Sequence, residues 1–280
     1  MNKLEFNEDG SIKIPEARDR GEKNNFERSL KIATSLFGDY KNKAGVFSEF
    51  KFPPEYNLPP GMKRGSEDQL RYITLTVSFD YMRDAEVLWK QSFNSWIDEK
   101  TRWIFNPKKV VENGKEELIK VLKEINDQRP NKDGLIWFTI CKKLKDYNFQ
   151  IFNLIESLDL DAIKINNYLE ENKKSFPYLN GYKIKPLWLR IIDETVGIRL
   201  KGIKEIPIPI DVHTARMTLK IVFGEKFSGK IDKKLRKRTQ NIWKEILKDE
   251  EIYPLQLDEP LWLLGKYNLL DKFMENHDFQ

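Results

Sequence analysis

Apolar residues recur at helical spacing along most of the chain. Between residues 67 and 103 they return every three or four positions, as at Leu70, Ile73 and Val77, and Asn106-Pro107 ends this region. The same spacing predicts shorter helices over 27–40, 116–125, 134–144 and 149–158, and one that runs from a cap at Asp159 or Asp161 to about residue 172. The sequence contains no series of alternating segments joined by hairpin turns. We therefore predict an all-α fold.

Two segments lack the helical pattern. Residues 1–25 are polar and predict a loosely structured arm, and residues 51–66 (KFPPEYNLPPGMKRGS) form a connector rich in proline and glycine. We therefore predict an N-terminal arm and connector over 1–66, partly irregular, followed by a helical region over 67–280. The candidate chemistry of that region lies within residues 172–224.

A helical hairpin is predicted at the start of residues 172–224. One helix ends near Lys174, the tight turn Phe176–Gly181 follows, and a second helix begins around Lys183–Pro186. The buried face of this second helix is predicted to hold Trp188, Ile191, Ile192 and Thr195. Backbone amides of such a turn can bind a phosphate, with Lys183 and Lys185 beside them. A helical pair with one glycine can equally be purely structural, so the pattern alone leaves both alternatives open.

A rigid lead-in precedes the next helix. In Ile206–Ile210 (IPIPI) the two prolines remove backbone donors and restrict φ, which predicts an extended connector and not a central strand. Asp211 follows directly and is predicted to be the N-cap of a helix. A helix N-terminus also stabilises a carboxylate, so a second interpretation makes Asp211 a fixed catalytic acid.

Composition and charge narrow the class of protein. The chain is 40% hydrophobic and 33% charged, which is typical of a globular protein, and no apolar run approaches the roughly 18–20 residues of a membrane span. The N-terminus is polar and contains acidic residues, so we expect no secretory signal and a cytoplasmic, intracellular protein, associated with the nucleoid if the source is prokaryotic. The net charge of +5 is compatible with a phosphate-backbone partner.

Metal chemistry is not expected. Cys141 is the only cysteine and His213 and His277 are the only histidines, so the chain can supply neither a four-thiolate iron–sulfur cluster nor a cysteine-based zinc site. We expect no metal, no cofactor and no membrane partner, and we expect a monomer.

Three motifs together resemble the helix-hairpin-helix (HhH-GPD) DNA glycosylase superfamily. The first is Gly181-Tyr182-Lys183 at the head of the second hairpin helix, and the second is the string Ile206–Arg216 (IPIPIDVHTAR) that contains Asp211. The likeness is nearest to the archaeal 8-oxoguanine DNA glycosylases, which have a similar double-proline run and a C-terminal Asp-x-x-x-Trp element, matched here by Asp258 and Trp262. The motifs cover about 100 residues, and the N-terminal half shows no comparable match.

The resemblance implies a two-lobed helical architecture and an enzymatic activity on DNA. It implies a DNA N-glycosylase, with AP-lyase activity left open, that excises an oxidised purine such as 8-oxoguanine from double-stranded DNA in base excision repair. Asp211 would be the catalytic carboxylate and Lys183 the nucleophile, with Lys185 as its rival. The base pocket would hold Asp258, Trp262 and Arg190. The residues implied to contact DNA are Asn180, Gly181, Lys185, His213 and Arg216.

Departures from the superfamily pattern keep alternatives open. Asn180 stands where the hairpin usually has a further glycine, and Lys183 and Asp211 are 28 residues apart, which is longer than in most of the superfamily. Arg190 has two interpretations, as a contact to base or phosphate or as a solvated side chain. A non-catalytic helix-hairpin-helix DNA-binding module and an N-glycosidase for a modified nucleotide or RNA base are the alternative functions.

Two further segments have two interpretations each. The basic cluster Lys233–Arg238 (KKLRKR) can grip a phosphate backbone or form a solvated helix face. The aromatic run Trp89–Phe105 is predicted to pack in the core, with a stacking wall of the base pocket as the alternative.

Overall fold

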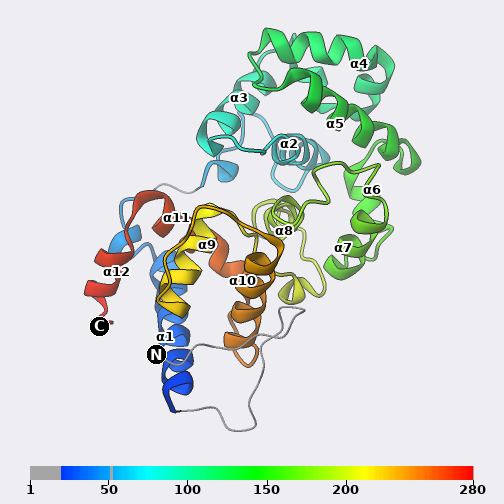
Figure 1. Ribbon diagram of the computed structural model, residues 1–280. Coiled ribbons are helices and arrows are strands. Elements are labelled where there is room, and N and C mark those ends of the chain that lie inside the picture. Colours follow the sequence, from blue (N-terminus) through cyan, green and yellow to red (C-terminus); the bar gives the residue numbers. More distant parts are fainter. Residues whose placement is uncertain (1–19, 51–52, 280) are drawn as a thin grey trace. The chain divides into compact units, whose positions relative to one another are not determined.

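The described part of the protein is helical throughout (Figure 1). The computed structural model describes residues 20–50 and 53–279. These residues contain no β-strand, and their one isolated β-bridge joins Asp161 to Lys201. The predicted all-α fold is therefore confirmed.

The chain forms two compact units. The terminal unit combines Met1–Lys51 with Lys204–Gln280, and the central unit is Phe52–Ile203. These boundaries differ from the predicted division at residue 66, because the helix near the N-terminus packs with C-terminal segments that are distant in sequence. The 3-10 helix η6 (Ile203–Glu205) lies at the junction.

The terminal unit consists of short helices around one long helix. Its α-helices are α1 (Arg20–Asn42), α9 (Val212–Thr218), α10 (Lys233–Ile246), α11 (Asp258–Tyr267) and α12 (Leu270–Asn276). Its 3-10 helices are η1 (Gly45–Phe47) and η8 (Pro254–Leu257). A π-helix, η7 (Leu219–Phe223), continues α9 and ends at Gly224, whose φ is +63°.

Helix α1 corrects the prediction for the N-terminal segment. The sequence pattern predicts an irregular arm over 1–25 and a helix over 27–40, whereas α1 begins at Arg20 and ends at Asn42. The first turns of α1 are charged and polar, so they carry no apolar periodicity, although glutamate and lysine favour helix. The rest of the predicted arm, residues 1–19, lies outside the described residues.

The lead-in to α9 is extended and held from two sides. Ile206, Ile208 and Ile210 are all buried, and the segment forms no strand, as predicted. The side-chain amide of Gln240 in α10 donates to the carbonyl oxygen of Ile208 at 3.1 Å. The backbone that leads to Asp211 is therefore anchored both by apolar burial and by a hydrogen bond.

The central unit is a helical array that ends with the hairpin. Its α-helices are α2 (Glu67–Ser78), α3 (Ala85–Ile97), α4 (Pro107–Glu124), α5 (Pro130–Leu144), α6 (Ile151–Glu156), α7 (Ala162–Glu171) and α8 (Ile184–Arg190). Its 3-10 helices are η2 (Pro54–Tyr56), η3 (Arg102–Phe105) and η4 (Lys145–Tyr147). A π-helix, η5 (Ile191–Val196), continues α8 and ends at Gly197, whose φ is +86°.

Side-chain caps define several of these helix starts. Asp161 accepts hydrogen bonds from the backbone amides of Ile163 and Lys164, so of the two predicted caps for α7 it is the one used. Asn106 caps α4 and Pro107 is its first residue, so the Asn-Pro pair that was predicted to end one helical region also begins the next helix.

The aromatic run belongs mainly to the core of the central unit. Tyr72 in α2 is buried, and its ring centroid lies 5.8 Å from that of Trp89, 6.0 Å from that of Trp96 and 5.6 Å from that of Phe105. Trp89 and Phe105 are buried as well. These contacts agree with the core interpretation of the run.

Helices α9 and α11 approach each other closely at Gly265. A Cβ atom on Gly265 would lie 2.8 Å from Cβ of His213 and 3.0 Å from the backbone oxygen of the same residue. Real Cβ atoms do not come this close, so the spacing of the two helices depends on the absence of a side chain at residue 265.

We predict that Gly265→Ala lowers the free energy of unfolding by about 1–3 kcal/mol, because the added methyl must push α11 away from α9. Gly38→Ala in α1 is the matched control, since nothing lies within 4 Å of its added Cβ. The control should raise stability by about 0.5–1 kcal/mol, as alanine usually does in a helix. Urea unfolding measures both changes, and a shift of the same sign in both variants would contradict the predicted clash.

Candidate active site

Asp211 is the N-cap of α9, as predicted. Its Oδ1 accepts hydrogen bonds from the backbone amides of His213 and Thr214, both at 2.9 Å. Its second oxygen, Oδ2, makes no hydrogen bond or ion pair with another described residue of the terminal unit, and the residue is half-buried. One oxygen therefore fixes the orientation of the carboxylate, and the other is left for a ligand.

Two predicted DNA contacts on α9 face α11. The ring of His213 meets that of Trp262 edge-on, with centroids 6.2 Å apart and an interplanar angle of 81°. Arg216 donates from Nη2 to the carbonyl oxygen of Gly265, and the same nitrogen lies 3.5 Å from Nδ1 of His213. Arg216 therefore ties the two helices together, and His213 joins the Asp211 helix to the predicted base-pocket tryptophan.

The predicted base-pocket pair lies on α11. Asp258 is the first residue of α11 and only 7% exposed, and Trp262 follows one turn later at the i, i+4 spacing that places both on one face. Trp262 is half-buried, and Nζ of Lys266 lies 4.7 Å from its ring centroid. The terminal unit thus combines an acid, an aromatic face and a cation along a single helix.

Glu259, between these two residues in sequence, is a buried acid that sequence reasoning missed. It is 6% exposed, the hydroxyl of Tyr40 in α1 donates to its Oε2, and burial raises its pKa to about 8. In the sequence it looks like an ordinary first-turn acid, because nothing nearby indicates that α1 covers it. The carboxyl group of Glu259, which follows Asp258 directly in the sequence, is therefore mostly protonated at neutral pH.

The hairpin turn is shaped by Tyr178, Asn180 and Gly181. Tyr178, not Asn180, takes the left-handed conformation, with φ +63°. Asn180 donates from Nδ2 to the carbonyl oxygens of Phe176 at 2.6 Å and Lys173 at 3.1 Å. A Cβ on Gly181 would lie 2.8 Å from the backbone oxygen of Tyr178, so glycine is required there by space. Asn180 and Gly181 therefore both shape the turn.

The two candidate lysines have different surroundings in the central unit. Lys183 is the N-cap residue of α8, and its Nζ lies 2.8 Å from Oδ2 of Asp80, with its side chain 31% exposed. Lys185 pairs with Glu170 of α7 at 2.9 Å, and its side chain is only 9% exposed. Lys183 is thus the more accessible amine and Lys185 the more desolvated one.

Arg190 is placed inside the central unit, which corrects both of its interpretations. It is 2% exposed, its Nη2 lies 2.9 Å from Oε1 of Glu55, and its Nη1 lies 3.6 Å from Oε2 of Glu194. A buried guanidinium with two carboxylate partners is neither solvated nor open to a base or phosphate. The sequence gives no sign of this, because Glu55 lies 135 residues away in the proline-rich connector.

An exposed aromatic and cationic surface beside the hairpin was also missed. Tyr81, before α3, meets Tyr178 of the hairpin turn at 5.2 Å between ring centroids. The guanidinium of Arg129 lies 4.6 Å from the first ring and 5.5 Å from the second, and Nζ of Lys132 lies within 5.7 Å of both. Next to Tyr81, Met82 is 87% exposed with a φ of +53°. Aromatic faces and cations on one surface can bind nucleic acid. The sequence pattern does not reveal this surface, because its residues come from three separate segments of the chain.

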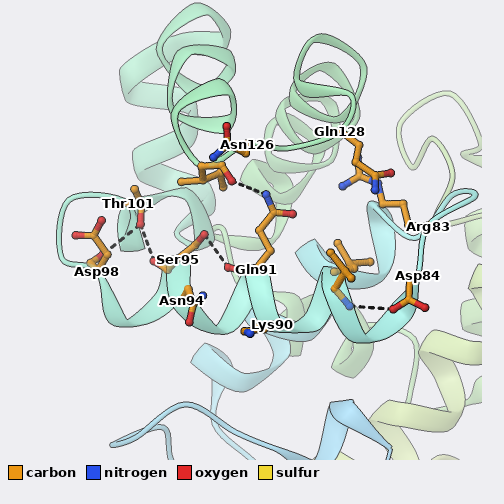
Figure 2. Close-up of a pocket in the computed structure, with 13 residues that line it drawn as sticks. Arg83, Asp84, Lys90, Gln91, Asn94, Ser95, Asp98, Thr101, Asn126 and Gln128 are labelled. Carbon is orange, nitrogen blue, oxygen red and sulfur yellow. Dashed lines mark hydrogen bonds between the residues drawn. The ribbon is translucent and has the colours of Figure 1, made fainter.

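A polar cavity of about 560 Å³ opens beside α3 in the central unit (Figure 2). Its lining includes none of the predicted site residues and no aromatic ring. Gln91 and Thr101 donate to the backbone oxygens of Ile125 and Ser95, so part of the polar lining is already bonded within the protein (Figure 2). A pocket for an extruded base needs stacking faces, so this cavity does not have the features of one.

Two negative findings concern the described residues alone. Among them no group of three or more His, Cys, Asp or Glu side chains is arranged to hold a metal ion. No helix in the same residues has both the length and the apolar composition to cross a membrane.

We predict that Glu259→Gln raises the free energy of unfolding, and that this gain is larger at higher pH. The buried carboxyl has a pKa of about 8, whereas the unfolded chain ionises at an ordinary value near 4.5, so wild-type stability falls as pH rises between these values. Glutamine keeps an acceptor for Tyr40 but does not titrate. Urea unfolding at about pH 5 and pH 8 should therefore give the larger difference between variant and wild type at the higher pH. An equal difference at both would show that Glu259 ionises normally.

Comparison with known proteins identifies the family of the chain. The sequence profile of the AGOG family, described as N-glycosylase/DNA lyase, matches residues 76–278, which is well over half of the chain. The match extends into the N-terminal half, where the motifs alone showed no likeness. No curated protein matches the chain in a sequence search. The chain therefore belongs to the AGOG family of N-glycosylase/DNA lyases, helix-hairpin-helix enzymes that act on 8-oxoguanine in DNA repair.

Proposed function

We propose that Asp211 and Lys183 carry out base excision in this enzyme, with Asp258 and Trp262 forming the pocket for the extruded base. The observation that carries the proposal is the Asp211 carboxylate, of which Oδ1 is held by two backbone amides while Oδ2 makes no bond within the terminal unit. Asp211 belongs to the terminal unit and Lys183 to the central unit, and each role is argued from its own surroundings.

Asp211 stabilises the positive charge that develops on the sugar. Breaking the C1′–N bond gives the sugar oxocarbenium character, as in glycoside hydrolysis. A carboxylate whose position is fixed before the reaction stabilises this charge without reorganisation. The buried isoleucines of the lead-in and the capping amides supply that fixed position.

Lys183 supplies the nucleophile. Its neutral amine attacks C1′ as the C1′–N bond breaks, and the departing base takes the bonding electron pair and a proton. Loss of a proton and opening of the sugar ring then give a Schiff base, and removal of a C2′ proton expels the 3′ phosphate. Accessibility supports Lys183, whereas the burial of Lys185 favours the neutral amine that attack requires. Lys185 is therefore retained as the alternative.

The extruded base stacks on Trp262. The indole offers an aromatic face one helical turn from Asp258, whose carboxylate can accept a hydrogen bond from a purine N–H. Nζ of Lys266 lies over the same ring, 4.7 Å from its centroid, and adds positive charge to this face of the helix. His213 and Arg216 orient this helix pair, while Asn180, Gly181 and Lys185 present the hairpin amides and charge to a phosphate. Arg190 has no part in the pocket.

The enzyme acts as a monomer, without a metal or another cofactor, in the compartment that holds the DNA. With one cysteine in the chain, a four-thiolate iron–sulfur cluster cannot be built from its own residues. For a prokaryotic source that compartment is the cytoplasm, where the enzyme would associate with the nucleoid.

We predict that Asp211→Asn lowers the single-turnover excision of 8-oxoguanine from duplex DNA on the order of 10³-fold, because the amide cannot stabilise the sugar cation. Asparagine still caps a helix, so folding and DNA binding should be retained. Asp161→Asn is the matched control, since Asp161 caps α7 through the same two backbone positions. Comparable loss in both variants would assign Asp211 a structural role only. Release of base from free nucleotides but not from duplex DNA would indicate a different substrate class.

We predict that borohydride traps a covalent enzyme–DNA adduct in wild type and Lys185→Gln but not in Lys183→Gln, because only the nucleophilic lysine forms the reducible Schiff base. The two variants are matched, since each removes one ion pair with a carboxylate of the central unit. The reverse pattern would assign the nucleophilic role to Lys185. Trapping in both variants would show that neither lysine alone is required for the adduct.

A further inference from the structure

Positive charge is concentrated in one segment of the terminal unit. Residues 220–238 contain eight basic and two acidic residues, a net charge of +6, whereas the whole chain carries +5. The remaining residues together therefore carry a net charge of −1. The basic character of this protein belongs to the end of α9–η7, the loop that follows it and the first turns of α10.

Part of this charge is neutralised within the unit and part is not. Arg238 forms two hydrogen bonds with Glu225, at 2.8 and 2.9 Å, and lies 3.7 Å from the ring centroid of Phe223, and Lys220 pairs with Asp271. Four other side chains are exposed and form no ion pair with a described residue of the terminal unit. These four, the lysine patch, are Lys226, Lys230, Lys233 and Lys234.

The stability of α10 does not explain the lysine patch. Lys233 and Lys234 occupy the first two positions of α10, directly after its cap Asp232. Cations in a first turn face the positive end of the helix dipole, which is unfavourable for the isolated helix. An anionic partner would reverse this cost, so the arrangement suits a polyanion better than an isolated helix.

The lysine patch has a defined separation from Asp211, because both belong to the terminal unit. Helix α9 and its continuation η7 span Val212–Phe223, which corresponds to roughly 18 Å at the usual helical rise. Helix α10 is joined to the lead-in through Gln240 and to α9 through a 2.8 Å hydrogen bond from Trp243 to Thr218. The patch therefore stands roughly 10–20 Å from Asp211, the length of about three to six base pairs of duplex.

We propose that the lysine patch binds the phosphate backbone of undamaged duplex DNA, about three to six base pairs from the extruded nucleotide. Contact with DNA follows from the family, whereas the distance from the lesion rests on the proposed role of Asp211. Such a contact is independent of sequence and anchors the flanking duplex while the damaged nucleotide leaves the stack. It is separate from the hairpin, which belongs to the central unit.

The test measures binding to undamaged duplex over a range of salt concentrations. Each phosphate contact contributes about 0.9 to the slope of log K against log salt. The variant with glutamine at all four patch positions should therefore lower the magnitude of that slope by about 3.6, and should leave the thermal midpoint unchanged or slightly raised. The control has glutamine at four exposed lysines of α4 in the central unit, Lys108, Lys109, Lys120 and Lys123. A slope equal to wild type, or an equal loss in the control, would overturn the proposal.

A second measurement tests the position of the contact. Duplexes with one 8-oxoguanine, placed either centrally or about four base pairs from one end, are compared for the binding of both proteins. Wild type should lose affinity when the flank on one side is shortened, and the patch variant should not. Equal sensitivity in both would overturn the assigned position. Because neither measurement needs turnover, Asp211→Asn protein should give the wild-type results, which separates failure of this proposal from failure of the proposed catalysis.

Discussion

The contact between α9 and α11 at Gly265 determines the geometry of the terminal unit. With no side chain at residue 265, the backbone of His213 lies against α11, and the helix that begins at Asp211 is set at a fixed spacing from the helix that carries Asp258 and Trp262. Apolar burial of the lead-in adds a second constraint. The Asp211 carboxylate is thus positioned by packing and backbone amides.

Buried ionisable groups are paired or kept neutral within the protein, whereas some surface charges are not. Arg190 meets two carboxylates inside the central unit, and Glu259 is kept protonated by burial beside the Tyr40 hydroxyl. Both solutions avoid an isolated buried charge, whose desolvation would be costly. The four exposed lysines of the lysine patch form no ion pair with a described residue of their unit. The buried ionisable groups therefore contribute to the fold, whereas the unpaired surface lysines can bind an anionic partner.

Local rules predicted the features that depend on neighbouring residues. The caps Asp161 and Asp211, the extended IPIPI segment and the buried face of α8 follow from residues within one or two turns of each other. Features that depend on distant segments were missed or misread. Arg190 meets Glu55 across 135 positions, Glu259 is covered by α1, and the left-handed residue of the hairpin is Tyr178. The start of α1 was missed because its first five residues are polar or glycine and show no apolar periodicity.

Two helices, α8 and α9, end in the same unusual way, as π-helices that stop at a left-handed glycine. A π-turn holds about one residue more than an α-turn, so it is equivalent to an inserted residue that the helix has absorbed. Deleting one residue within Leu219–Phe223 would let the backbone relax to ordinary α-helical pairing, with the chain after it nearly in register. The same deletion within Val212–Thr218 would instead rotate every following side chain by about 100° and misalign the interface with α11. The distal end of this helix therefore tolerates a change in length, whereas the end that begins at Asp211 and packs against α11 does not.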